Sequence, residues 1–372
     1  MSDADDSLLH RQVEGNAHTK AAFRIATLMT RGGAPVPVGV SQASISPPRA
    51  RRARLVAAFG IGTAAAIVSG LHVANTFHRF QVGDFTPIYV GAQAMLKGAD
   101  PYAAVAARTD LWLHLLFYPY PALVIIAPLL TLPMQLAATA FIAFGSAWLA
   151  YVVTREAWWP LWIFAGAGFF QSVLSVQWTP LLIAAALAGP SAGLALAVKP
   201  TYALPLLAMQ SRIRAILLAA GVGIGLVLVS LLIAPHWPSW YARTVRESPI
   251  RGEYISPAFT WLGLPLWLAL LRWRSWQSRL LLGMAITPLN AWTYSHLPLL
   301  LVARTRQQLA LLALASWVAY FATNRITFQI VSNTPIVAVT SHVEWIAIVG
   351  YYLPALLVVL VGPNPGAVSV ER

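Results

Sequence analysis

Residues Thr76–Pro121, TFHRFQVGDFTPIYVGAQAMLKGADPYAAVAARTDLWLHLLFYPYP, form a polar, Asp-bearing segment between one long apolar span and a nearly continuous series of further apolar spans. Of the 372 residues, 58% are hydrophobic and 10% are charged, against roughly 25% charged in soluble domains. Backbone at membrane depth must satisfy its own hydrogen bonds, so polar chemistry is displaced to the rim of the membrane. The sequence therefore predicts an all-α, polytopic integral membrane protein whose functional site lies in or beside this segment.

The chain before this segment divides into a polar tail and one apolar span. Residues 1–54 contain Gly/Pro-rich pieces and are predicted to be a mostly disordered cytosolic tail. Leu55–Thr76 contains no Asp, Glu, Lys or Arg and is too long for the apolar region of a signal peptide, which predicts the first membrane helix. The arginines directly before this helix predict a cytosolic N-terminus; they are Arg49, Arg51, Arg52 and Arg54.

The chain after the segment is a succession of apolar spans, and we expect ten to twelve crossings in all, with twelve favoured. Several spans are shorter than the ~20 residues of a straight crossing, which predicts broken or re-entrant helices. The predicted membrane domain covers residues 55–362, and a short cytosolic tail follows at 363–372. Its two large outer loops are predicted at 77–117, which is juxtamembrane and helical, and at 236–257.

Charge supports this topology independently of hydropathy. The connections at 210–214, 272–279 and 304–308 contain arginines and no carboxylate, as the positive-inside rule expects of cytosolic loops. The net charge of +13 therefore indicates topology and attraction to anionic lipids, with no nucleic-acid partner. Cysteine is absent, which excludes disulfides and thiolate metal sites. The acidic residues outside the termini all fall on the opposite face: Asp84, Asp100, Asp110, Glu156, Glu247, Glu253 and Glu344.

Asp84 is the candidate functional carboxylate. It follows Gly83 and precedes a predicted helix from about Pro87 to Lys97, which Gly98 and Pro101 would end. A carboxylate in this place is either the cap of that helix or a catalytic group, and the residue pattern leaves both interpretations open. Asp100, beside Gly98 and Pro101, is predicted to form a turn, and Asp110 and Glu156 have no motif support.

Six short motifs carry a family resemblance. The chain resembles the GT-C glycosyltransferases of family 87, the polyprenyl-phosphate-sugar-dependent enzymes related to α-1,2-mannosyltransferases, from about residue 55 to 305. One position departs from the pattern, because Val176 stands where this family usually has glycine. The motifs, in order, are Asp84-Phe-x-x-x-Tyr89, Leu96-Lys-Gly-Ala-Asp-Pro-Tyr102, Phe117-Tyr-Pro-Tyr-Pro121, Val176-Gln177-Trp-Thr-Pro, Ala197-Val-Lys199-Pro200 and Tyr294-Ser-His296.

The resemblance implies a GT-C fold with Asp84 as the catalytic general base. A lipid-linked sugar phosphate is already activated, so one carboxylate is needed to deprotonate the acceptor hydroxyl, and positive charge or hydrogen-bond donors are needed for the leaving phosphate. No nucleotide, cofactor or obligatory metal is expected. Candidates for the donor phosphate are Lys199, His296, Arg79, Lys97, Arg243, Arg246 and Arg251. Candidates for the sugar or the acceptor are Tyr89, Tyr118, Tyr120 and Gln177.

Several of these residues also have a purely structural interpretation. The aromatic and cationic side chains of 236–257 fit an interfacial belt with snorkelling arginines equally well. Lys199, inside an apolar stretch, is either functional or extends to the nearest interface. His296 is either a ligand for the phosphate or sugar or a structural hydrogen bonder, and Tyr118 and Tyr120 either stack on sugar or begin a rigid interfacial helix.

The leading functional hypothesis is a multi-pass glycosyltransferase of the cytoplasmic (inner) membrane. It passes a sugar from polyprenyl phosphate to a lipid or glycan hydroxyl at the extracytoplasmic face, with inversion at the anomeric carbon. The resemblance favours mannose and leaves arabinofuranose, glucose and other pentoses or hexoses open. The alternative is a transporter or flippase of lipid-linked substrates in which Lys199 contacts the substrate. A third hypothesis is an inactive scaffold that keeps the fold.

Overall fold

The computed structural model describes residues 48–76, 83–108, 115–247, 254–290, 292–330 and 344–361, all within one compact unit, Val40–Gly362. The regular structure of these residues is helical except for two short antiparallel strands, β1 (Tyr254–Ile255) and β2 (Leu289–Asn290). The prediction of an all-α protein is confirmed. Residues 1–47 of the predicted N-terminal tail and the predicted tail at 363–372 lie outside the described residues.

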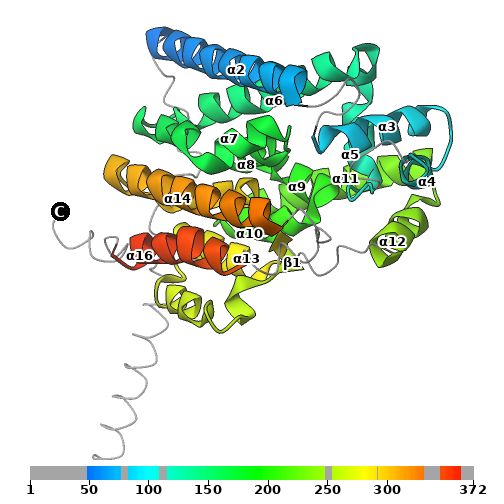
Figure 1. The fold of residues 1–372 in the computed structure, drawn as a ribbon. Coiled ribbons are helices and arrows are strands. Elements are labelled where there is room, and N and C mark those ends of the chain that lie inside the picture. Colours follow the sequence, from blue (N-terminus) through cyan, green and yellow to red (C-terminus); the bar gives the residue numbers. More distant parts are fainter. Residues whose placement is uncertain are drawn as a thin grey trace, which may run out of the picture. The chain divides into compact units, whose positions relative to one another are not determined.

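The first predicted membrane helix is present and begins earlier than expected. Helix α2 covers Pro48–Thr76, so the arginines predicted to lie in the tail occupy its first turns. It packs lengthwise against α6 (Met134–Val153) (Figure 1). A Cβ atom at Gly62 would lie 2.9 Å from the carbonyl oxygen of Ala143, so the two backbones approach where α2 has no side chain. Close contact through small residues is how helices associate in lipid.

Among the described residues, four helical segments are long and apolar enough to cross a membrane: Arg49–Asn75, Met134–Val153, Ile213–Ile233 and Glu344–Val361. Ala167–Leu174 and Thr179–Ala188, which form a bent pair, raise the number to five if they count as one span. The segment Ile213–Ile233 is α11, and it exposes Leu217, Ile224 and Leu232. A helix that is apolar on all sides and exposed along its length is typical of a lipid environment. The chain therefore has the helices of a multi-pass membrane protein.

The number of long helices among the described residues is smaller than the ten to twelve crossings expected from hydropathy. The other apolar stretches are divided into short pieces, because prolines remove backbone donors and turns or 3₁₀ segments interrupt the α-helices. These pieces are α5 (Tyr120–Ile126), η1 (Ala127–Thr131), η2 (Trp159–Ala165), α7 (Ala167–Leu174), α8 (Thr179–Ala188), η3 (Pro190–Ala192), α9 (Gly193–Val198), α10 (Pro200–Ala208), η6 (Leu264–Arg272), α13 (Trp276–Ile286) and η7 (Thr293–Val302). How many of them cross as broken spans stays a prediction.

The predicted helical first loop is present where the structure describes it. Helix α3 covers Phe85–Leu96, which confirms the helix predicted at Pro87–Lys97. A second helix, α4 (Pro101–Ala106), follows, and Asp100 accepts hydrogen bonds from its first backbone N–H groups, those of Tyr102 and Ala103. The turn-forming role predicted for Asp100 is therefore confirmed as an N-cap.

The remaining elements complete the helical unit. Helix α12 (Trp237–Glu247) occupies the predicted second outer loop and packs against α4 and α5. In Figure 1, α14 and α16 lie side by side, and the two helices are in contact. The other bounds are η5 (Pro257–Phe259), α14 (Arg306–Ile330), η8 (Ile348–Tyr352) and α16 (Leu353–Val361).

Candidate functional site

Asp84 lies in the turn before α3 and is attached to a distant part of the chain. Its backbone N–H donates to the carbonyl oxygen of Ser175 over 3.2 Å. Gly83 makes this approach possible, because its φ is +49° and a Cβ atom there would lie 2.8 Å from the same oxygen. Any other L-residue would be strained and would clash with the Ser175 backbone. The glycine before Asp84 therefore sets the position of the aspartate.

The Asp84 side chain does not cap α3. Asp84 is at the N-cap position, but its carboxylate makes no capping hydrogen bond. Instead, Oδ2 accepts a short hydrogen bond from Nε2 of Gln177, and the Tyr294 hydroxyl donates to the same oxygen over 3.5 Å. Asp84 as a whole residue is half-buried, and its carboxyl group is the buried part. The capping interpretation left open by the sequence is thereby excluded, since the carboxylate is held by side chains that are remote in sequence.

Gln177 lies in the interruption between α7 and α8, where the chain bends by 119°. Its side chain is fully buried and accepts at Oε1 from the Tyr118 hydroxyl over 3.5 Å, while its amide nitrogen serves Asp84. Val176, directly before it, has a left-handed backbone with φ +50°. This is the conformation that glycine adopts most easily and that a β-branched residue avoids. Val176 thus stands in a backbone conformation suited to the glycine of the family pattern.

Tyr294 approaches Asp84 from the 3₁₀ helix η7. Its backbone N–H donates to Oε1 of Gln171 over 2.9 Å, and its hydroxyl accepts from Nδ2 of Asn290 over 3.0 Å. Asn290 belongs to β2 and pairs with Tyr254 of β1. The hydroxyl that donates to the Asp84 carboxylate is therefore oriented by an amide on the small sheet.

Lys199 lies where α9 ends and α10 begins, at a backbone of φ −145° and ψ 78°. Its ammonium nitrogen is 4.9 Å from the ring centroid of Tyr202, 5.3 Å from that of Tyr294 and 5.9 Å from that of Tyr118. Aromatic faces at these distances stabilise a cation that has left bulk water. Two of these tyrosines also belong to the Asp84 network, and Lys199 interacts electrostatically with the Asp84 carboxylate.

The surroundings of Asp84 favour the protonated carboxyl. Burial raises the pKa of Asp84 above that of an ordinary aspartate, and the hydrogen bond from Gln177, the charge of Lys199 and the hydrogen bond from Tyr294 oppose this rise. A carboxylate with a raised pKa is a stronger base than one in water. Such a group is suited to accept a proton from a hydroxyl at neutral pH.

Three predicted site residues join Asp84 in one cluster, and two tyrosines lie in other contacts. Gln177 and Tyr118, predicted as sugar or acceptor ligands, and Lys199, predicted as a phosphate ligand, belong to the cluster around Asp84. The Tyr89 hydroxyl donates to the carbonyl oxygen of Leu132 over 2.8 Å, and the Tyr120 ring stacks on Trp237 at 6.2 Å. These contacts of Tyr89 and Tyr120 join helices and do not involve Asp84.

His296 points away from the side chain that reaches Asp84. Residues two apart in a 3₁₀ helix lie about 240° apart around its axis, so His296 and Tyr294 face different directions. The His296 ring packs 4.7 Å from Tyr351 and 5.4 Å from Tyr352 and is 2% exposed. The cations on α12, Arg243 and Arg246, and Lys97 after α3 are exposed. Arg79 and Arg251 lie outside the described residues.

Sequence reasoning assigned no role to four of the residues that build this cluster. Tyr294 belongs to the motif Tyr294-Ser-His296, in which only the histidine was a candidate. Tyr202 lies two positions after Pro200. Asn290 and Gln171 stand in no motif, so only the tertiary contacts identify them. Within the described residues, no group of three or more His, Asp or Glu side chains is placed to hold a metal ion.

No protein-family model, curated protein or solved structure matches this chain.

Proposed function

We propose that this protein is an integral-membrane glycosyltransferase that moves a sugar from a polyprenyl phosphate to a hydroxyl of a lipid or glycan acceptor. The observation that carries the proposal is the Asp84 carboxylate, which is held by Gln177 and Tyr294 next to the Lys199 ammonium instead of capping its own helix. An oriented base beside a cation is the pair that this reaction requires. The motif order in the sequence supports the GT-C family 87 type and mannose as the sugar.

The chemistry is a single displacement. Asp84 accepts the proton of the acceptor hydroxyl while the hydroxyl oxygen forms a bond to the anomeric carbon. The bond from that carbon to the phosphate oxygen breaks, and its electron pair leaves with the polyprenyl phosphate. Lys199, held among its three tyrosine rings, stabilises the negative charge on that leaving phosphate. The anomeric configuration inverts, so a β-linked donor yields an α-linkage.

The side of the membrane on which the reaction takes place is inferred from the distribution of arginines and carboxylates along the chain. With the arginine-rich connections in the cytosol, Asp84 works at the extracytoplasmic face of the cytoplasmic membrane. The interrupted helices around the site fit this proposal, because non-helical backbone at membrane depth is tolerated where protein buries it or where it lines a cavity.

The decisive experiment compares Asp84→Asn with Asp100→Asn in purified protein supplied with a panel of polyprenyl-phosphate sugars and extracted acceptor lipids. Asp84→Asn keeps an oxygen for Gln177 and Tyr294 but removes the base, so we expect transfer to fall on the order of a hundredfold or more while donor binding persists. Asp100→Asn keeps its capping oxygen and should transfer sugar normally. Product is read as the mass increase of the acceptor lipid.

Other outcomes separate the competing functions. A transporter or flippase would move the lipid-linked substrate across vesicles without forming product, and Asp84→Asn would then have no transferase activity to remove. A scaffold would bind donor lipid and form no product with any acceptor. Full transfer by Asp84→Asn would overturn the assignment of Asp84 as the base.

A further inference from the structure

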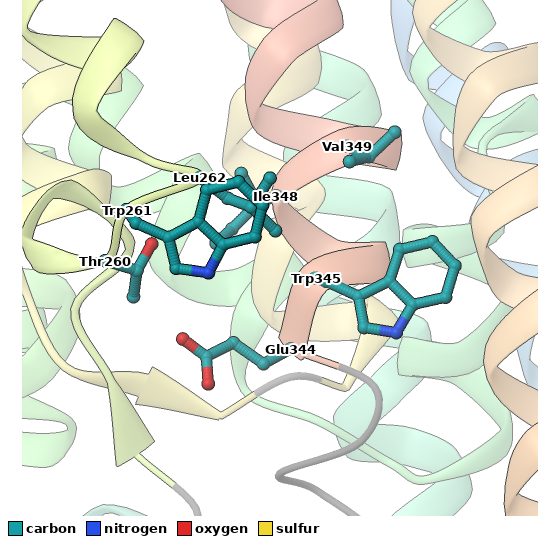
Figure 2. Close-up of a pocket in the computed structure, with 7 residues that line it drawn as sticks. All are labelled: Thr260, Trp261, Leu262, Glu344, Trp345, Ile348 and Val349. Carbon is teal, nitrogen blue, oxygen red and sulfur yellow. The ribbon is translucent and has the colours of Figure 1, made fainter.

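A cavity lies at one end of a candidate membrane span, formed by residues other than those around Asp84. It has a volume of about 750 Å³ and lies between the turn before η6 and the first turns of the segment Glu344–Val361 (Figure 2). This volume is within the range of small-molecule sites, roughly 300–1,000 Å³. The residues that line it are Thr260, Trp261, Leu262, Glu344, Trp345, Ile348 and Val349.

One carboxylate, that of Glu344, lines the cavity. Glu344 is half-buried, and in Figure 2 its carboxylate points to the side of the helix where Trp261 and Thr260 lie. Among the residues that the structure describes, no hydrogen bond or ion pair engages this carboxylate. A partly desolvated charge without a partner is unfavourable, and a cationic ligand would compensate it.

An indole ring lies on the same side of the helix as the Glu344 carboxylate. Trp261 is 78% exposed, so it presents an uncovered aromatic face, whereas the ring of Trp345 points to the other side of the helix (Figure 2). Tryptophan is the side chain that attracts a cation most strongly through its ring. A carboxylate and an indole face beside one space are the chemistry that recognises an ammonium group.

The cavity offers little to a hydroxyl-rich ligand. The Thr260 hydroxyl already donates to the carbonyl oxygen of Pro257 over 2.8 Å and accepts from the backbone N–H of Gly263 over 3.1 Å. The remaining lining side chains, Leu262, Ile348 and Val349, are apolar and match the hydrocarbon part of an amphiphile. These contacts favour an ammonium-bearing amphiphile over a sugar.

The position of the cavity identifies the source of that ammonium. Glu344 is the first residue of a candidate span, and the ends of a span lie at the depth of the lipid headgroups. We propose that this cavity binds the ammonium headgroup of a membrane phospholipid, with Glu344 as the counter-ion and Trp261 as the aromatic wall. This proposal is independent of the glycosyltransferase proposal.

The test uses full-length protein in nanodiscs of phosphatidylethanolamine and phosphatidylglycerol, followed by native mass spectrometry of the lipids that stay bound. Wild-type protein should retain phosphatidylethanolamine preferentially, and Glu344→Gln should lower this preference about tenfold, the effect of losing ~1.4 kcal/mol. Glu156→Gln, which changes an exposed glutamate outside the cavity, should retain the wild-type preference. Trp261→Leu should lower the preference as well, without removing the carboxylate.

Two results would overturn the proposal: equal retention of both lipids by wild-type protein, or an unchanged preference in Glu344→Gln. If Glu344→Gln is poorly folded, Trp261→Leu decides alone, because its side chain is largely exposed. Sugar transfer by Asp84 is measured separately, so failure of the lipid preference leaves the glycosyltransferase proposal untouched.

Discussion

At the scale of single residues, the chemistry around Asp84 depends on its neighbours as much as on the carboxylate itself. Gln177 and Tyr294 bind the same oxygen, Oδ2, and Lys199 adds positive charge. Each of these groups stabilises the ionised form, while burial opposes it, and burial is the larger effect. The balance leaves a base whose protonation responds to a change in any one of its neighbours.

The pH dependence of transfer should report this balance. A general base acts only when ionised, so activity falls as the pH decreases through the pKa of Asp84, and the raised pKa places this fall above the ordinary range of aspartate. Lys199→Met removes a charge that lowers the pKa, so the fall should move to higher pH. Lys199→Arg keeps the charge, so its activity should fall near the same pH as that of the wild-type protein. A profile of kcat/KM against pH measures this pH in both variants. If the activity of Lys199→Met falls at the wild-type pH, the electrostatic coupling between Lys199 and Asp84 is contradicted.

The backbone of Val176 provides a test of strain. At most positions glycine is less stable than alanine by roughly 0.5–1 kcal/mol. At φ +50° the order should reverse, because a left-handed backbone costs an L-residue roughly 1–2 kcal/mol and costs glycine nothing. We therefore expect Val176→Gly to be more stable than Val176→Ala by about 1 kcal/mol. Thermal unfolding in detergent measures the difference, with Val229→Gly and Val229→Ala, in the interior of α11, showing the ordinary order.

At the scale of the elements, the residues of the site lie where one helix ends and the next begins. Asp84 stands in the turn before α3, Gln177 in the bend between α7 and α8, and Lys199 between α9 and α10. Interruptions bring unsatisfied backbone and polar side chains to one place, which in a membrane protein requires burial by protein or a water-lined space. The contact between Gly83 and Ser175 joins two of these interruptions.

That contact can be tested with two glycines that share a positive φ. Gly83 has φ +49° and meets the Ser175 carbonyl oxygen, whereas Gly98 has φ +71° and open space where a Cβ atom would be. Gly98→Ala should therefore bear only the backbone cost, about 1 kcal/mol. Gly83→Ala bears this cost plus a clash with backbone, so it should separate Asp84 from Gln177 and lower transfer far more than Gly98→Ala. Activity and melting temperature are compared in both variants, and similar losses would argue against the contact.

At the scale of the whole molecule, apolar surface and charge together indicate a membrane and an orientation. The exposed leucine and isoleucine side chains of α11 fit a lipid environment, and the arginines at its N-terminal end, Arg212 and Arg214, predict that this end lies in the cytosol. Its other end is followed by α12 with Trp237 and Trp240, at the depth where aromatic residues gather.

The orientation is testable because the chain contains no cysteine. Ser211→Cys and Ser239→Cys introduce single thiols at exposed positions beyond the two ends of α11. A membrane-impermeant maleimide should label Ser239→Cys in intact cells and Ser211→Cys only after permeabilisation. Labelling of both variants from one side would mean that α11 does not cross the membrane. The reverse pattern would contradict the predicted orientation, and with it the extracytoplasmic location proposed for Asp84.

The sequence by itself determined the fold class, the long apolar helices α2, α6 and α11, the helix after Asp84 and the turn at Asp100. These features follow from local composition and hydrogen-bonding rules that act within a few residues. Its motifs also named Asp84, Gln177 and Lys199 as candidate site residues, and the structure brings these three together.

Only the tertiary structure decided between capping and side-chain contacts for Asp84, added Tyr294 and Asn290 to its network, and separated Tyr89 and Tyr120 from it. These outcomes depend on which interrupted helices meet and on the direction each side chain takes from a bent or 3₁₀ backbone. Such directions arise from packing between residues that are one or two hundred positions apart. No local pattern in the chain encodes them.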